Sequence, residues 1–111
     1  MEDIFKKSIL FDLYGGILNE NQKLVYEYHV IDDLSFAEIG EELGISRQAA
    51  YDLFKTADKK LKSIESRLEL SERFKNIEKY AKDIIKLANG NSKIINLSNK
   101  IIEKTLKGGN N

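Results

Sequence analysis

The stretch LGISRQAAYDLFK, residues Leu43 to Lys55, decides the fold of this chain. Gly44 suits a tight turn because glycine adopts a left-handed backbone at little cost, and Ser46 is a good N-cap for a following helix. Two helices that cross steeply also need a small residue at their closest approach, which Gly40 supplies. Together these features predict a helix-turn-helix whose second helix continues to about Leu68.

The rest of the chain also has apolar residues at helical spacing, and it contains no proline. We therefore predict an all-α protein. Asn19 with Gln22, and Ser35 with Glu38, match capping boxes that begin two helices. The first four predicted helices cover residues 2–13, 20–31, 36–43 and 47–68. A fifth helix begins at residue 70 and is ended by Gly90, and a sixth is capped by Ser92. Gly15 and Gly16 can take a positive φ, so we expect them to end the first helix.

The phase of the apolar residues predicts how these helices pack and where the chain divides. It shifts between Glu69 and Ser71, so we expect a break or bend there. We divide the chain into a helix-turn-helix domain (1–70), a C-terminal helical extension that is a candidate dimerisation element (71–107) and a flexible tail (108–111). The side chains expected to face inward include Ile4, Phe5, Ile9 and Leu13, then Leu24, Val25 and Tyr28, and finally Ile94, Leu97 and Ile101.

The outer side of the second helix is the candidate nucleic-acid surface. Arg47 and Gln48 lie near its N-terminal end, where such side chains can make paired hydrogen bonds to base edges. Lysines further along can reach phosphates. The alternative is that these polar residues merely cover the outside of a tri-helical unit. The candidate contacts are Ser46, Arg47, Gln48, Tyr51, Asp52, Lys55 and Lys59, with Lys60 and Lys62 as further phosphate contacts.

Charge is distributed unevenly along a chain that is neutral as a whole. Residues 1–45 carry 3 basic and 10 acidic groups. Residues 46–70 carry 6 basic and 4 acidic groups, and residues 71–111 carry 9 basic and 4 acidic groups. Because DNA affinity comes largely from phosphate neutralisation, the acidic scaffold argues against tight autonomous DNA binding.

A stripe of lysines follows in the C-terminal extension. Lys75, Lys79, Lys82 and Lys86 recur at helical spacing and define one continuous face, which we call the basic stripe. Such a face is usually just solvated. It is also suited to docking on an acidic protein surface, on RNA phosphates, or on the acidic N-terminal region of a second copy.

Several function classes find no support in the sequence. There is no Gly-rich phosphate loop, nucleophile signature or metal-ligand cluster, and His29 sits among aromatic residues, so we expect a protein that is not an enzyme and holds no metal or cofactor. The absence of cysteine is compatible with a reducing compartment. No run of about 18 apolar residues occurs, so no membrane contact is expected, and the cytoplasm is the default location.

The run from FDLYGG to KTADKKL resembles the YlxM family of small bacterial proteins, most specifically in DLSFAEI followed by SRQAAYD. Its centre is also similar to the DNA-binding region 4 of sigma factors. The resemblance covers about Phe11 to Leu70. The chain departs from the family pattern at three positions, where relatives commonly have alanine in place of Gly40, valine in place of Ala50 and arginine in place of Thr56. The residues that match the family's signature are Ser46, Arg47, Gln48, Tyr51 and Asp52, with Lys55 at a basic position.

The resemblance implies an accessory protein of the signal recognition particle pathway that contacts the particle's RNA or its GTPase. The alternatives are a transcription regulator that binds duplex DNA as a homodimer, and a structural interaction module that uses the basic stripe. Asp52 repels phosphates, and a pairing with Arg47 at i+5 is marginal in a straight helix. An intrahelical pair therefore does not explain Asp52, and a protein or RNA partner is the hypothesis for it.

Overall fold

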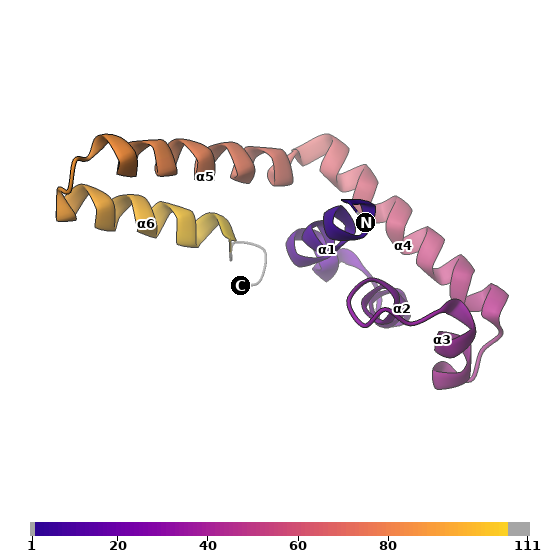
Figure 1. Cartoon of the computed structure of the whole chain (residues 1–111). Helices are drawn as coiled ribbons and strands as arrows, with labels where there is room; N and C mark the ends of the chain where they lie inside the picture. The colour runs from indigo at the N-terminus through magenta and orange to yellow at the C-terminus, as the bar shows by residue number, and fades with distance from the viewer. Residues whose placement is uncertain (1, 107–111) are drawn as a thin grey trace. The chain divides into compact units, whose positions relative to one another are not determined.

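The computed structural model describes residues 2–106, with side chains from Asp3 to Thr105. Their regular structure is entirely helical, which confirms the all-α prediction (Figure 1). The chain divides into two compact units, one up to Leu68 and one from Glu69 onward. The predicted tail, 108–111, lies outside the described residues. The elements are α1 (Glu2–Tyr14), a 3-10 turn η1 (Gly15–Ile17), α2 (Glu20–Val30), α3 (Phe36–Leu43), α4 (Arg47–Leu68), α5 (Leu70–Leu87) and α6 (Ser92–Leu106).

The first helix differs from the prediction at its end and on its inner face. It ends at Tyr14 in the 3-10 turn η1, and neither Gly15 nor Gly16 has a positive φ. Ile4 and Phe5, expected to face inward, are exposed, whereas Lys7 is buried. The Lys7 ammonium donates to the Asp58 carboxylate of α4, so the inward face of α1 includes this lysine.

Both predicted capping boxes are present. The Asn19 and Ser35 side chains accept hydrogen bonds from the backbone N–H groups of Gln22 and Glu38, and these two residues return the interaction. The backbone N–H of Ser35 and its hydroxyl both hold the pKa of Glu38 below its usual value. Each box satisfies donors that the first turn of a helix otherwise leaves unpaired, so the starts of α2 and α3 are fixed locally.

The core of the first unit lies where α1, α2 and α3 pack on α4. Val25, Tyr26, Ile39 and Leu61 are fully buried, and the Tyr26 ring stacks on Phe54 with centroids 5.1 Å apart. The prediction for α2 was correct for Val25 but wrong in phase, because Leu24 and Tyr28 are only half-buried. The face that packs on α4 instead carries Gln22 and Tyr26, whose polar atoms bind α4.

The second unit is an antiparallel pair, α5 and α6 (Figure 1). The predicted break precedes it at Glu69, which has a left-handed backbone with φ of 54°. Helix α5 ends at Leu87, slightly before Gly90, and Gly90 has a φ of 83° in the turn. The last helix is capped by Asn91 rather than Ser92, because the Asn91 side-chain oxygen accepts hydrogen bonds from the N–H groups of Lys93 and Ile94.

The inner face predicted for α6 is also wrong. Ile94, Leu97 and Ile101 are exposed, while Ser98 and Thr105 are buried. The Thr105 hydroxyl donates to the carbonyl oxygen of Ile102, so its polar group is satisfied within the helix. The buried positions of α6 therefore carry small side chains, with Ile95 and Ile102 half-buried beside them.

Candidate nucleic-acid interface

The turn between α3 and α4 is built as the sequence predicted. Gly44 has a φ of 71°, and the N–H groups of Gly44 and Ile45 both donate to the carbonyl oxygen of Gly40. A Cβ added at Gly40 would lie 2.6 Å from the carbonyl oxygen of Ile45, so the two backbones meet there. Ser46 then caps α4 by accepting a hydrogen bond of 2.9 Å from the N–H of Ala49.

The outer side of α4 presents the predicted contact residues to solvent. Ser46, Arg47, Gln48, Tyr51 and Asp52 are all exposed, as are Lys55 and Lys59. The opposite side buries Ala50, Phe54, Ala57 and Leu61 against the other helices. The helix is therefore amphipathic along its length, and its polar side is open to a partner. Binding at these residues stays a prediction.

Asp52 has a partner within α4, contrary to the expectation from the sequence. The Gln48 amide nitrogen donates to its carboxylate at 3.0 Å, an i,i+4 pair. Arg47 plays no part in that bond. The pair accounts for the orientation of Asp52 without an external partner, and it leaves the Gln48 amide oxygen available as an acceptor.

Tyr51 links the outer side of α4 to the core. The Tyr51 ring packs edge to face on Phe36 of α3, with ring centroids 5.3 Å apart. The Lys55 ammonium lies over the Tyr51 ring, 6.0 Å from its centroid. Phe36 in turn stacks on His29 at 4.3 Å, and His29 Nδ1 donates to the carbonyl oxygen of Leu34 at 2.9 Å. Tyr51 thus has a structural role even though it is 40% exposed.

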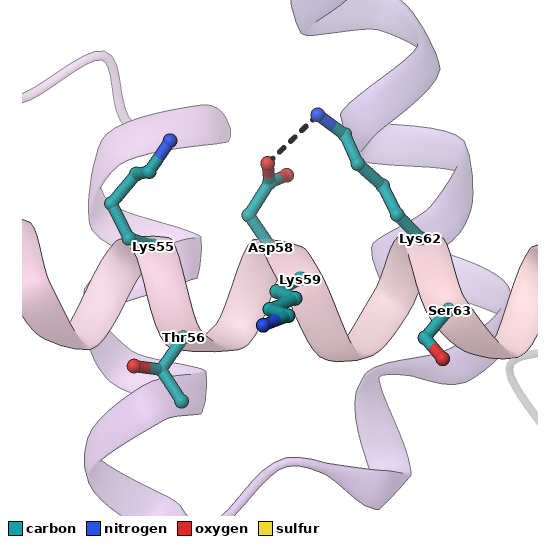
Figure 2. A pocket seen from close by; sticks show the side chains of 6 residues that line it. All are labelled: Lys55, Thr56, Asp58, Lys59, Lys62 and Ser63. Carbon is teal, nitrogen blue, oxygen red and sulfur yellow. Dashed lines mark ion pairs between the residues drawn. The ribbon is translucent and has the colours of Figure 1, made fainter.

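The lysines of α4 separate into two groups. Lys55, Lys59 and Lys62 line an open hollow together with Thr56, Asp58 and Ser63 (Figure 2). Lys60 instead donates to the side-chain oxygen of Gln22 at 3.1 Å, on the side that packs against α2. Gln48, Asp52, Lys55, Lys59 and Lys62 are spaced by four, three, four and three residues, so they form one stripe along the helix, which we call the α4 stripe.

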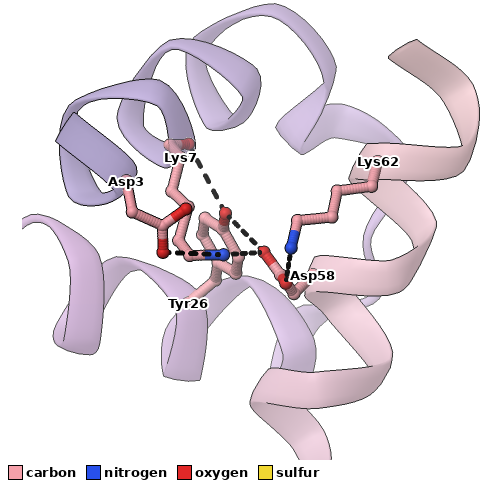
Figure 3. Close-up of polar contacts among 5 residues, drawn as sticks. All are labelled: Asp3, Lys7, Tyr26, Asp58 and Lys62. Carbon is pink, nitrogen blue, oxygen red and sulfur yellow. Dashed lines mark hydrogen bonds and ion pairs between the residues drawn. The ribbon is translucent and has the colours of Figure 1, made fainter. Parts of the chain in front are cut away.

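Lys62 is held by a buried carboxylate at the far end of that stripe. Its ammonium lies 3.0 Å from one oxygen of Asp58, and the Lys7 ammonium lies 2.8 Å from the other (Figure 3). The Tyr26 hydroxyl donates to the same Asp58 oxygen as Lys7, at 3.2 Å. The Asp58 carboxylate therefore joins α1, α2 and α4.

The electrostatics of this buried cluster follow from its geometry. Burial of Asp58 works to raise its pKa, but the hydrogen bonds and charges of Lys7 and Lys62 prevail and hold that pKa below its usual value. Burial, together with the Asp58 carboxylate, raises the pKa of Tyr26 far above that of a free phenol. Asp58 also raises the pKa of Lys62. Sequence reasoning missed the cluster; its one signal was a lysine within the apolar face of α1.

The four lysines of the basic stripe lie exposed along α5. Lys82 is paired with Glu78 at 3.0 Å. Each stripe lysine follows directly after a residue that is buried or half-buried, namely Phe74, Glu78, Ala81 and Ile85. The stripe therefore lies to one side of the contact between α5 and α6.

The part of the chain that the structure describes, residues 2–106, offers neither a metal-binding cluster nor a membrane-spanning helix. Among these described residues, no three His, Cys, Asp or Glu side chains come together in a way that could hold a metal ion. None of the helices in this part of the chain is both long enough and apolar enough to span a membrane.

Known proteins match most of the chain. The family described as "Putative helix-turn-helix protein, YlxM / p13 like" matches residues 1–103. The chain belongs to this family. It is 48% identical over 80 residues to a UPF0122 protein of Clostridium botulinum, covering 72% of this chain and 73% of that protein. It is 45% identical over 78 residues to one of Clostridium kluyveri, covering 70% of each. No solved structure matches the chain.

Proposed function

We propose that this YlxM/p13-like protein is a non-enzymatic accessory protein that binds nucleic acid through Arg47 and the α4 stripe. The observation that carries the proposal is the helix-turn-helix itself, because its turn leaves the start of α4 open to solvent beside a row of lysines. Arg47 and Gln48 would contact base edges, and Lys55 and Lys59 would contact phosphates.

The partner we propose is the RNA or the GTPase of the signal recognition particle. The resemblance to the YlxM family supports this choice, and so does the charge distribution. Residues 1–45 carry 3 basic and 10 acidic groups, an acidic scaffold that would repel an extended duplex. An RNA with unpaired bases offers base edges without requiring a long phosphate contact. The basic stripe would supply additional phosphate contacts.

A duplex-DNA regulator that acts as a dimer is the second candidate. The position of Arg47 and Gln48 at the exposed N-terminal end of α4 favours it, because helix-turn-helix proteins read the major groove with that part of the helix.

Capture from a lysate of the protein's own cells distinguishes the candidates. Tagged protein would be retrieved with its bound RNA, DNA and proteins, beside an Arg47→Ala, Gln48→Ala variant. We expect the particle's RNA or GTPase to be enriched and to be lost in the variant. Enrichment of discrete duplex DNA instead would establish the second candidate and overturn the first.

A matched pair of lysine variants tests where the phosphates bind. With the captured nucleic acid, Lys59→Gln should reduce the slope of log affinity against log salt by roughly 0.7 to 0.9, the share of one phosphate contact. Lys60→Gln removes the same charge one residue away, but Lys60 points toward Gln22. We expect its slope to match that of the unmodified protein. Equal losses for both variants would contradict the proposed surface.

A further inference from the structure

The pair of helices α5 and α6 leaves large apolar side chains outside its own contact. In α5 they are Ile77, Tyr80, Ile84 and Leu87, and in α6 they are Ile94, Leu97 and Ile101. Leu87 is 84% exposed, Tyr80 and Leu97 are each 62% exposed, and the isoleucines are about two-fifths exposed. This amount of uncovered apolar surface needs an explanation, because it is far from the scattered single residues of an ordinary surface.

These side chains gather on one side of the pair. In α5 each exposed apolar residue comes directly before a residue that is buried or half-buried against α6. In α6 the three exposed apolar residues likewise come directly before Ile95, Ser98 and Ile102, which face α5. One residue is about 100° of helix rotation. Because the helices are antiparallel, an equal offset turns both rows to the same side. The seven residues form one surface, the hairpin apolar face. The basic stripe follows the inward residues by one and so lies on the opposite side.

The outer edges beside this face carry opposite charges. Residues two positions after an inward residue point away from the other helix and lie at the edge next to the apolar face. On α5 these include the acidic Glu72 and Asp83. On α6 the basic Lys100 and Lys104 follow Ser98 and Ile102 by two positions, and Lys93 lies on the same face, two turns before Lys100. All five of these charged side chains are exposed. The apolar face thus has an acidic border along α5 and a basic border along α6.

We propose that the hairpin apolar face binds the same face of a second copy of this chain, forming a four-helix bundle. Its seven large apolar side chains lie together, and a contiguous apolar patch of this kind marks a protein contact. A two-fold axis can place α5 either on the partner's α6 or on the partner's α5. The first arrangement sets each acidic border against a basic border, whereas the second sets like charges together. We therefore assign α5 to the partner's α6, an arrangement in which neighbouring helices are antiparallel.

The association itself is tested with the full chain. Sedimentation equilibrium should give a dimer, and Leu97→Glu should weaken its association at least a hundredfold while far-UV circular dichroism stays unchanged. Asn96→Glu introduces the same side chain one residue earlier, on the far side of α6, and should leave the dimer intact. A monomeric unmodified protein, or equal effects of the two variants, would overturn the proposal.

The arrangement is tested by cross-linking, which is free of background because the chain has no cysteine. Tyr80→Cys and Leu97→Cys proteins would be treated with a short bismaleimide, separately and after mixing. Both positions lie on the apolar face toward the outer borders, so the proposed dimer brings position 80 of one copy near position 97 of the other. We expect covalent dimers only in the mixture. Efficient cross-linking within either variant alone would place α5 on the partner's α5 and reject the assigned pairing.

Discussion

The helix-turn-helix unit and the α5–α6 hairpin differ in what they enclose. The first buries aromatic and aliphatic side chains around a polar cluster, with Lys7, Asp58 and Tyr26 satisfied inside it. Among its described residues, the hairpin buries Ala81, Ser98 and Thr105, and its larger apolar residues are either half-buried or exposed. Three-sided packing on α4 lets the first unit complete a core, whereas two helices alone have only one contact line. We therefore expect the first unit to be the more stable of the two, and we expect association to add stability to a hairpin that is already helical.

The largest expected effect comes from removing Asp58. Asp58→Ala leaves the buried Lys7 ammonium with only the longer contact to the exposed Asp3 carboxylate, at 3.7 Å, so the first unit should lose about 3 kcal/mol or somewhat more of unfolding free energy. Urea unfolding followed by residue-resolved hydrogen exchange would measure it, with protection in the hairpin largely unchanged. Combining Lys7→Met with Asp58→Leu should recover much of the loss. If the double variant were as unstable as the single one, the buried charge would not be the cause.

A somewhat smaller loss is expected at the close approach of α3 and α4. Gly40→Val adds a Cβ that would lie 2.6 Å from the carbonyl oxygen of Ile45, so the backbone at this contact must move to accommodate the new side chain. Overpacking of this kind suggests a loss of about 3 kcal/mol. Thermal unfolding would report it. Gly16→Val is the control, because a Cβ at Gly16 meets nothing within 4 Å.

Acid should weaken the first unit through the same cluster. The pKa of Asp58 is lower in the folded protein than its ordinary value of about 3.9, so its contribution is present above that pH and is lost as pH falls through the folded-state pKa. Urea midpoints at a series of pH values between 6 and 2 would show the decline. Asp58→Asn, which cannot titrate, should flatten it. An unchanged pH profile in that variant would assign the acid sensitivity to other carboxylates.

The smallest of these effects distinguishes two neighbouring caps in the hairpin. Asn91→Ala should cost about 1 kcal/mol, because the Asn91 side chain accepts from two backbone N–H groups of α6. Ser92→Ala should change stability by less than about 0.5 kcal/mol, as expected for an exposed position. The reverse order of the two losses, measured by urea unfolding at one protein concentration, would restore the cap predicted from the sequence.

These residues also show what the sequence could predict. The capping boxes, the turn at Gly44 and the break at Glu69 depend on neighbouring residues, so local rules located them. The exposed outer side of α4 followed from helical spacing. The caps Asn91 and Ser92 are adjacent residues of similar propensity, and helix ends are uncertain by about one residue.

Packing was harder to predict because it depends on distant partners. The buried Lys7 ammonium binds Asp58, which lies 51 residues later in the chain. The spacing of apolar residues within α1 cannot predict a contact with so distant a residue. In the sequence Lys60 looks equivalent to Lys59, but in the structure the Lys60 side chain binds Gln22 of α2. In α6 the inward row carries Ser98 and Thr105, which a hydrophobicity pattern assigns to solvent.

The contact of Gly40 with the backbone of Ile45 has a practical consequence for protein engineering. The crossing of α3 and α4 is set by main-chain atoms rather than by side chains on the outer side of α4. Arg47, Gln48 and Lys59 can therefore be randomised together in a library without disturbing the scaffold that presents them. Selection from such a library would yield binders whose differences arise from the displayed side chains alone.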